Sequence, residues 1–362
     1  MKSIIIRSLA GLLASVLLVT GVALLGNMPN GKRTDGIFYE SSGIHPDAAL
    51  MTVNKRPVSA EEYLYWLAYD CDYLSSYLGT VDFDAAISGS MSYGQYAMAD
   101  AQRTVVLYSV VRAWAEKAGI TLSEESQAQL AAQRQQYVDY YGGEEGFLKQ
   151  LELIGLTDEG FQQINQVFFL YSELYKAYCG KGGALRPSDQ EIDSFAQAGG
   201  YNTFLPLYWV ISGDEAADAA TMEKARAAAE RMRNAEDITA AYLQIAQEMA
   251  LQTTGAGETR SSEETPKEIT AVLNTLAEGQ VSDVVVSGDS CYVFVKIALN
   301  TDAVLDKMFN AKLDTMRNSA AIRYNCRSYD KLDVGEFYTK LLTLRAQLQG
   351  ESAGSSGIAP LS

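Results

Sequence analysis

Residues 276–297 read LAEGQVSDVVVSGDSCYVFVKI, and this stretch indicates how the second half of the chain folds. A helical segment over 268–277 ends at Gly279, and two apolar, valine-rich runs follow at 284–286 and 292–297. Ser287, Gly288 and Asp289 stand between the runs, and such a short polar turn is typical of a β-hairpin. We therefore predict that a helix and a closing hairpin end a domain of mixed α and β structure.

The residues before this stretch complete the domain. Residues 205–211 form a β-branched and aromatic run around Trp209, which predicts a strand. Helices are predicted at 216–232 and 238–250, and a polar loop follows over 253–266. The expected order over residues 203–301 is β-α-α-α-β-β, a small α+β domain.

Residues 50–202 are predicted to form a helical lobe. After a short strand with a turn at Asn54-Lys55, Ser59 and Glu62 have the spacing of a capping box that begins a helix. Further helices are expected to end at Gly119 and to cover 123–140, 144–154, 157–178 and 188–198. The buried face of the first helix is predicted to consist of Leu64, Leu67, Cys71, Leu74 and Leu78.

The amino terminus has the pattern of an export signal. Lys2 and Arg7 precede an uncharged, mostly apolar run over 8–26, which is also about long enough to span a membrane. The residues at 24–27 resemble a lipoprotein box, but Asn27 stands where the lipidated cysteine would be. We expect residues 1–33 to be an uncleaved anchor with the bulk of the chain outside, and a cleaved signal peptide with a secreted chain is the alternative. Residues 34–49 are expected to be a tether.

Composition excludes several classes of protein. The net charge of −16 repels nucleic acid and anionic lipid surfaces, so neither is expected as a main partner. A single histidine, His45, leaves little material for a histidine-based metal site or catalytic triad, and no metal or cofactor is expected. The four cysteines form no C-x-x-C pair, and an exported location would allow three disulfide pairings among them. We expect Cys71 and Cys291 to be small buried apolar residues instead.

Several segments together resemble an extracytoplasmic foldase family. Residues 53–62 (VNKRPVSAEE), 119–125 (GITLSEE), 141–145 (YGGEE) and 187–192 (PSDQEI) are similar to the chaperone lobe of SurA, PrsA and trigger factor. Residues 276–285 and 291–297 resemble the closing part of a parvulin-type peptidyl-prolyl isomerase. The resemblance implies a discontinuous helical lobe in which 302–345 folds back onto 50–202 around an inserted parvulin-like domain, 203–301. Three sequential domains are the alternative, and 346–362 is expected to be a disordered tail.

The resemblance also implies that the isomerase pocket is degenerate. The family carries a histidine pair in the central strands, and these positions fall on Leu207 and Val293. The cysteine or aspartate of the family falls at Gln252, and residues 255–259 lack the expected Gly-Asp-Leu-Gly segment. No histidine occurs after His45, so we expect little isomerase activity.

The expected function therefore moves to the helical lobe. Tyrosine and tryptophan rings provide adaptable contact area for unfolded segments. We predict a membrane-anchored chaperone whose partners are unfolded or newly exported polypeptides, and the alternatives are a weakly active isomerase or a scaffold that docks through its parvulin-like module. An aromatic stripe at 161–178 is interpreted as helix packing. The candidate client-binding residues are Tyr63, Trp66, Tyr69, Tyr73 and Tyr77.

Overall fold

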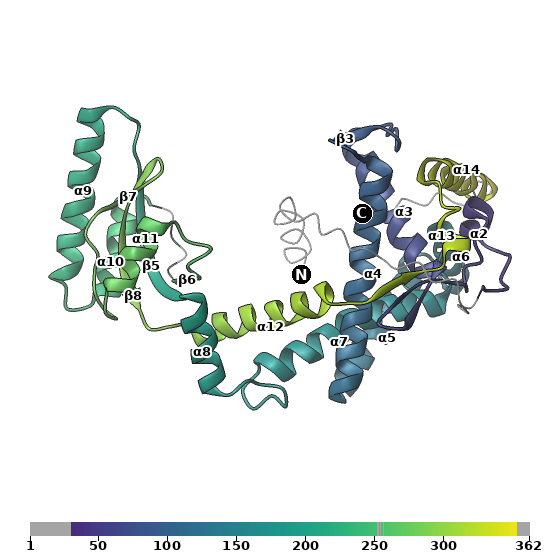
Figure 1. Cartoon of the computed structure of the whole chain (residues 1–362), viewed down its shortest axis with the longest axis horizontal. Coiled ribbons are helices and arrows are strands. Elements are labelled where there is room, and N and C mark those ends of the chain that lie inside the picture. Colours follow the sequence, from purple (N-terminus) through teal and green to yellow (C-terminus); the bar gives the residue numbers. More distant parts are fainter. Residues whose placement is uncertain (1–29, 252, 254, 256, 353–362) are drawn as a thin grey trace. The chain divides into compact units, whose positions relative to one another are not determined.

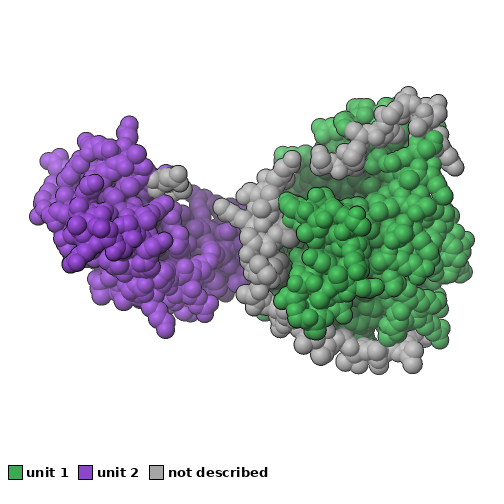
Figure 2. All heavy atoms as spheres, turned by 90° about the horizontal axis from the view of Figure 1, so that it is seen from above, with its two compact units in different colours: residues 1–174, 313–362 green, residues 175–312 purple. Residues whose placement is uncertain are grey.

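The computed structural model describes residues 30–251, 253, 255 and 257–352. Two compact units divide the chain (Figure 2). Unit 1 contains residues 1–174 and 313–362, and unit 2 contains residues 175–312. The two boundaries lie within helices, whereas the sequence placed them at 202/203 and 301/302. The mixture of helices with several small sheets confirms the predicted α+β class.

A three-stranded sheet joins the two sequence segments of unit 1. Strand β1 (Ala49–Val53) pairs with β2 (Arg56–Ser59) on one side and with β9 (Ile322–Tyr324) on the other. Asn54 and Lys55 both have positive φ, 51° and 70°, as the tight turn of a two-residue hairpin requires. The backbone N–H of Asn54 donates to the carbonyl of Ala321, and its side chain accepts from the Ala321 N–H. Residues far apart in sequence thus share one sheet.

Helices form the remainder of unit 1. Helix α3 (Ala60–Leu78) packs against α4 (Tyr93–Ala118), and a small hairpin of β3 (Ala86–Ser88) and β4 (Met91–Ser92) precedes α4. The N-terminal turns are capped as the sequence predicts, because the Ser59 and Ser123 side chains accept backbone N–H bonds. The other helices that contribute to this unit are α2 (Ile37–Ser42), α5 (Glu124–Tyr140), α6 (Glu144–Ile154), α7 (Asp158–Cys179), α13 (Cys326–Tyr329) and α14 (Val334–Ser352).

The expected tether at 34–49 is instead part of the folded unit. Ile37 and Phe38 of α2 are buried, and the Phe38 ring lies 6.1 Å from that of Phe337 on α14. Gly155 allows this packing, because a Cβ there would lie 2.4 Å from the Phe38 ring. Two apolar residues within six were too short a signal to distinguish this helix from polar linker.

The carboxyl-terminal expectations also need correction. Residues 321–329 contain the three-residue strand β9, after which the short helix α13 begins. Helix α14 continues to Ser352, so residues 346–352 are helical and not part of a disordered tail. Arg345 binds the Asp72 carboxylate at 2.8 Å and donates to the Leu153 carbonyl at 2.9 Å, which fixes α14 against α3 and α6. Residues 353–362 lie outside the described residues.

Unit 2 is built around a four-stranded antiparallel sheet of order β6-β5-β8-β7 (Figure 1). The long central pair is β5 (Asn202–Val210) and β8 (Ser290–Ile297), with β6 (Glu258–Arg260) and β7 (Val285–Ser287) at the edges. Strand β6 lies in the segment 253–266, which was predicted to be a loop. The strand was missed because its three polar residues carry no strand pattern. The helices of this unit are α8 (Asp189–Gly199), α9 (Glu215–Arg233), α10 (Ile238–Glu248) and α11 (Lys267–Thr275), with α12 (Thr301–Asn318) crossing the unit boundary.

Different helices cover the two faces of this sheet. Leu205, Leu207 and Val293 pack with α9 and α10, while Phe204 and Phe294 pack with α11. Alternation of side chains along β5 and β8 explains the division, since neighbouring residues point to opposite faces. A register that pairs Leu207 with Val293 therefore puts both on the α9/α10 side.

The predicted membrane anchor falls almost wholly on residues 1–29, which lie outside the described residues. Within the part that the structure describes, no helix has the length and apolar character to cross a membrane. Residues 32 and 33 belong to the fold of unit 1: both backbone N–H groups donate to the Asp47 carboxylate, and Arg33 pairs with Glu61 at 2.7 Å.

Candidate functional site

The positions predicted to carry a degenerate isomerase pocket lie inside the core of unit 2. Leu207 is 1% exposed and Val293 0% exposed, beneath α9 and α10. Because their side chains contact only the core, they are closed to a ligand. The third predicted position, Gln252, lies outside the described residues.

The opposite face of the same strands is aromatic and partly open. Tyr208 and Tyr292 are paired across β5 and β8, with ring centroids 6.0 Å apart, and Tyr208 is 40% exposed. The Tyr292 ring stacks on Phe294 at 5.6 Å with an interplanar angle of 8°. Sequence reasoning missed these tyrosines because it placed the site one residue away on each strand. Strand periodicity would have located them once the covered face was known.

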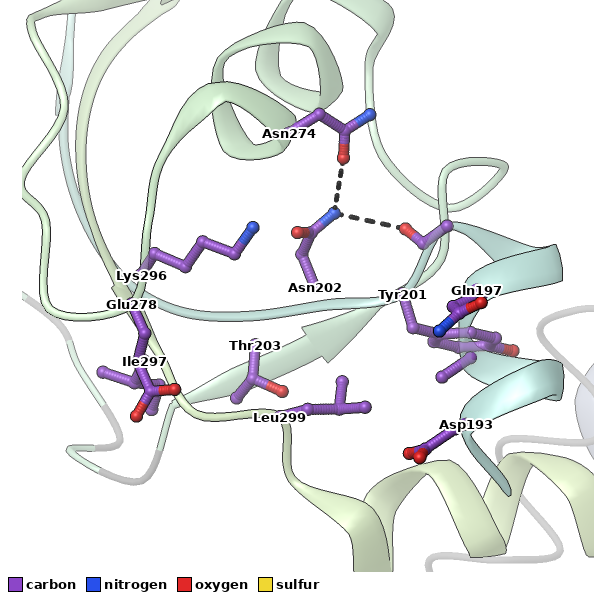
Figure 3. Close-up of a pocket in the computed structure, with 12 residues that line it drawn as sticks. Asp193, Gln197, Tyr201, Asn202, Thr203, Asn274, Glu278, Lys296, Ile297 and Leu299 are labelled. Carbon is purple, nitrogen blue, oxygen red and sulfur yellow. Dashed lines mark hydrogen bonds between the residues drawn. The ribbon is translucent and has the colours of Figure 1, made fainter. Parts of the chain in front are cut away.

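A cavity of about 260 Å³ lies where α8 meets the start of β5 and the end of β8 (Figure 3). The Asn202 amide donates to the Asn274 side chain at 3.1 Å and to the Gly200 carbonyl at 3.2 Å. Lys296, on the opposite wall, donates to the Leu273 carbonyl at 2.9 Å. These polar groups are used in fastening α8 and α11 to the sheet, so the cavity is a structural junction.

In unit 1, helix α3 presents an aromatic stripe to solvent. Trp66, Tyr69, Tyr73 and Tyr77 recur at spacings of three and four, which places them on one side of the helix. Tyr69 is 50% exposed, Tyr73 39% and Tyr77 73%. The Tyr73 and Tyr77 rings lie 4.8 Å apart, and Tyr69 lies one turn before Tyr73 on the same side of the helix. We call Trp66, Tyr69, Tyr73 and Tyr77 the α3 stripe.

Tyr63 does not belong to this surface, contrary to the prediction. Its side chain is 0% exposed, and its hydroxyl donates to the Met98 carbonyl at 3.0 Å. With about 100° between successive helical residues, Tyr63 lies within about 40° of Leu67 and so shares the buried face. Leu78, predicted to be buried, is 52% exposed at the last turn of α3. Burial raises the pKa of the Tyr63 hydroxyl well above its ordinary value.

Neighbouring helices extend the α3 stripe at its Trp66 end. The Trp66 ring makes edge contacts with Tyr69 at 5.7 Å and with Tyr108 of α4 at 5.4 Å. Tyr108 in turn contacts Phe168 of α7, which is 47% exposed. The 161–178 stripe is thus not uniformly buried, because Phe168 is open while Ile164 is 5% exposed.

The buried side of α3 contains an unusual carboxyl pair. Asp70 is 9% exposed, and its Oδ2 atom has no hydrogen-bond partner. Burial, together with the neighbouring carboxyl of Asp100 on α4, raises the Asp70 pKa from 3.8 to about 9. Arg103 donates to the Asp100 carboxylate at 3.1 Å. Asp70 therefore holds a proton at neutral pH.

Cysteine and metal chemistry do not define a site in the described residues. All four cysteines are free, and Cys71 and Cys291 are fully buried, as predicted from their apolar surroundings. Burial raises the pKa of the Cys71 thiol, which makes it a poor nucleophile. Within the ranges that the structure describes, there is no cluster of three metal-ligating side chains.

Residues 189–306 match the family model of the PPIC-type peptidyl-prolyl isomerase domain. This segment is a parvulin-type domain. It contains the sheet of unit 2 and helices α8 to α11, and the resemblance predicted from residues 276–297 is confirmed. The domain match covers about a third of the chain.

Solved structures similar to the chain include foldases. The foldase PrsA of Lactococcus lactis is 11% identical, with 82% of this chain and 93% of that chain covered and a TM-score of 0.27. PrsA of Bacillus subtilis is 11% identical, covering 71% and 90%, with a TM-score of 0.28. A SurA-like chaperone of Campylobacter jejuni is 12% identical, covering 76% and 98%, with a TM-score of 0.19. These TM-scores are low, so the assignment rests on the domain match. No curated protein sequence matches the chain.

Proposed function

We propose that the protein is an extracytoplasmic folding factor, anchored to the membrane through the apolar run at 8–26, that binds unfolded or newly exported polypeptides. The α3 stripe carries this proposal. Its rings are apolar enough to hold an exposed apolar segment, and their hydroxyl groups keep the free surface hydrated. The parvulin-type domain supports a place in protein folding, and the export-like amino terminus supports a location outside the cytoplasm.

The net charge of the chain affects its solubility and which client polypeptides it attracts. The chain has a net charge of −16, which keeps the free protein soluble while it presents open aromatic rings. A client with a basic segment would meet an attractive field, and one with an acidic segment would be repelled. We therefore expect binding to basic unfolded clients to weaken as salt rises.

An aggregation assay tests the α3 stripe. The Tyr69→Ser/Tyr73→Ser/Tyr77→Ser variant should lose suppression of aggregation several-fold, because three open rings are removed while the helix remains. Tyr140→Ser is the matched control, since Tyr140 is 68% exposed and lies on another helix, α5. Circular dichroism should show the same helix content in all three proteins. Equal suppression by parent and triple variant would contradict the proposal.

Catalysis of prolyl isomerisation is the second candidate, favoured by the PPIC-type domain match. The parvulin-type domain has no histidine, and Leu207 and Val293 are buried. Refolding limited by an X-Pro bond takes tens to hundreds of seconds without a catalyst. We expect the protein to accelerate such refolding by less than severalfold, and a strong, saturable acceleration would favour the enzyme instead.

Topology can be tested separately. Protease added to intact cells should digest the chain beyond residue 33 and leave a membrane-bound fragment that begins at Met1. A mature form that begins near Asn27 and is free in the medium would favour a cleaved signal peptide.

A further inference from the structure

Within the described residues, the outer edge of strand β5 is only partly paired. Strand β6 pairs with Asn202, Thr203 and Phe204, and the pairing stops there. Pro206 follows, and its lack of an N–H group prevents the ladder from continuing at that residue. The Pro206 carbonyl is satisfied by the Tyr242 hydroxyl at 3.1 Å. Beyond Pro206, no described residue pairs with this edge.

Backbone alternation identifies which groups face this edge. The Ile211 N–H donates to the Asp289 carbonyl at 2.8 Å, toward β8, and Phe204 lies opposite Glu258 of β6. In an antiparallel strand successive residues direct their N–H and C=O groups to opposite sides. Tyr208 and Val210 hence direct theirs outward, as Pro206 does. Among the described residues, no group bonds to the N–H and C=O groups of Tyr208 and Val210.

A groove runs beside these open groups. Its volume is about 450 Å³, and its walls are Tyr208, Trp209 and Val210 of β5, Thr221 and Lys224 of α9, and Ala250 with Leu251 after α10. Val210 is 67% exposed, and Leu251 packs against the core of the domain. Ala250 has a φ of 51°, which turns the chain out of α10 and brings Leu251 to the groove. The groove is thus apolar along the strand and has one lysine on its helical wall.

We propose that this edge binds an extended polypeptide segment, which adds to the sheet as a strand beside β5. Only an extended backbone supplies N–H and C=O groups at the spacing that Tyr208 and Val210 present. Side chains at alternate positions of the added strand would lie in the groove against Leu251 and Thr221, so apolar residues are favoured there. Lys224, for which no ion pair is found in the described residues, would bind a carboxylate of the segment. The proposal rests on the proposed function, because it gives the client polypeptide a second binding site.

A peptide-binding experiment on the full-length protein tests the edge. The probe is a fluorescent hexapeptide of alternating valine and threonine with a free carboxyl terminus. Val210→Pro removes an outward N–H while leaving the β8 side of the strand intact, and Val210→Ala is its matched control. We expect the proline variant to bind at least tenfold more weakly than the alanine variant. Equal affinity of the two variants would overturn the proposal.

Two further measurements test the Lys224 contact and the backbone pairing separately. Lys224→Ala should weaken binding of the free-carboxylate peptide about threefold and leave an amidated peptide unaffected. Hydrogen exchange at the Tyr208 N–H should slow on binding, while exchange at Trp209, already bonded toward β8, should not change. The proposal would be contradicted if exchange at the Tyr208 N–H did not slow when the peptide binds. It would also be contradicted if two copies of the chain paired through this edge and the peptide did not displace them. The Tyr69→Ser/Tyr73→Ser/Tyr77→Ser variant should bind the peptide normally, so failure at the α3 stripe and failure at the β5 edge are distinguishable.

Discussion

Helix α3 and the β5/β8 pair both alternate between core and surface, but with different periods. On α3 three tyrosines of the stripe can face solvent beside the half-buried Trp66 while the opposite side packs, because each face repeats every three or four residues. On β5 and β8 a shift of one residue moves a side chain from a core that is closed to a face that is open. Leu207 and Tyr208 are neighbours in sequence, yet one is 1% and the other 40% exposed. The register of β5 and β8 therefore decides which side chains of the parvulin-type domain are exposed to a ligand.

The largest expected effect separates the two sides of α3. Tyr63→Ala should destabilise unit 1 by about 3–5 kcal/mol, because it removes a fully buried ring. The Met98 carbonyl also loses the hydroxyl that donates to it. Tyr77→Ala, on the exposed stripe, should change stability by less than about 0.5 kcal/mol. Urea unfolding followed by circular dichroism measures both, and similar losses would show that the two faces were wrongly assigned.

The second prediction makes the same comparison on the sheet. Val293→His should destabilise unit 2 by about 2–4 kcal/mol, because an imidazole overfills a closed apolar core and is left without a partner. Tyr292→His is the matched variant on the other face, and it should be tolerated within about 1 kcal/mol. If Val293→His folded as stably as Tyr292→His and gained isomerase activity, residue 293 would belong to an open pocket after all.

The core beneath α3 differs from the core of the unit 2 sheet because it contains a buried carboxyl, that of Asp70, so we expect its stability to depend on pH. Asp70 keeps its proton in the folded state up to about pH 9, whereas the unfolded chain releases it near 3.8. The stabilisation from this group is complete below 3.8 and is lost as pH rises toward 9, by up to about 1.4 kcal/mol per pH unit. Asp70→Asn should flatten this slope and raise the melting temperature at neutral pH. A steeper decline in the variant would contradict the assignment.

The sequence predicted the helices of unit 1 well, because caps and apolar spacing are local signals. Ser59, Ser123 and Ser188 each begin a helix where expected, and the hairpin turn lies at Asn54-Lys55. Short elements were missed, since neither α2 nor β6 is long enough to show a period.

The candidate site was harder to predict than the fold. Tyr69, Tyr73 and Tyr77 were placed correctly on the surface, but Tyr63 differs from them only by a rotation about the helix axis. Leu207 and Val293 could not be assigned to a face until the helices that cover each side of the sheet were known. The open edge of β5 depends on where β6 stops, which no local pattern indicates.

The smallest expected effect concerns helix caps in the two units, where the same Ser-x-x-Glu pattern has two outcomes. At α8 the box is complete: the Ser188 hydroxyl accepts from the Glu191 N–H, and the Glu191 carboxylate accepts from the Ser188 N–H at 2.8 Å. At α3 the Ser59 hydroxyl accepts from the Glu62 N–H, but the Glu62 carboxylate turns to Arg112 at 2.9 Å.

These bonds shift the two pKa values in opposite directions. Hydrogen bonds from Ser188 lower the pKa of Glu191, whereas burial raises that of Glu62 despite the arginine. The contribution of Glu191 is therefore lost as pH falls through its lowered pKa, and that of Glu62 is lost as pH rises through its raised one. Ser188→Ala should cost about 1 kcal/mol at neutral pH, and this cost should shrink in acid as Glu191 is protonated. Ser59→Ala should cost a similar amount that stays constant in acid, because Glu62 makes no return bond to the cap. Thermal unfolding of both variants between neutral and acidic pH measures the difference, and a parallel pH dependence would mean that the two caps work alike.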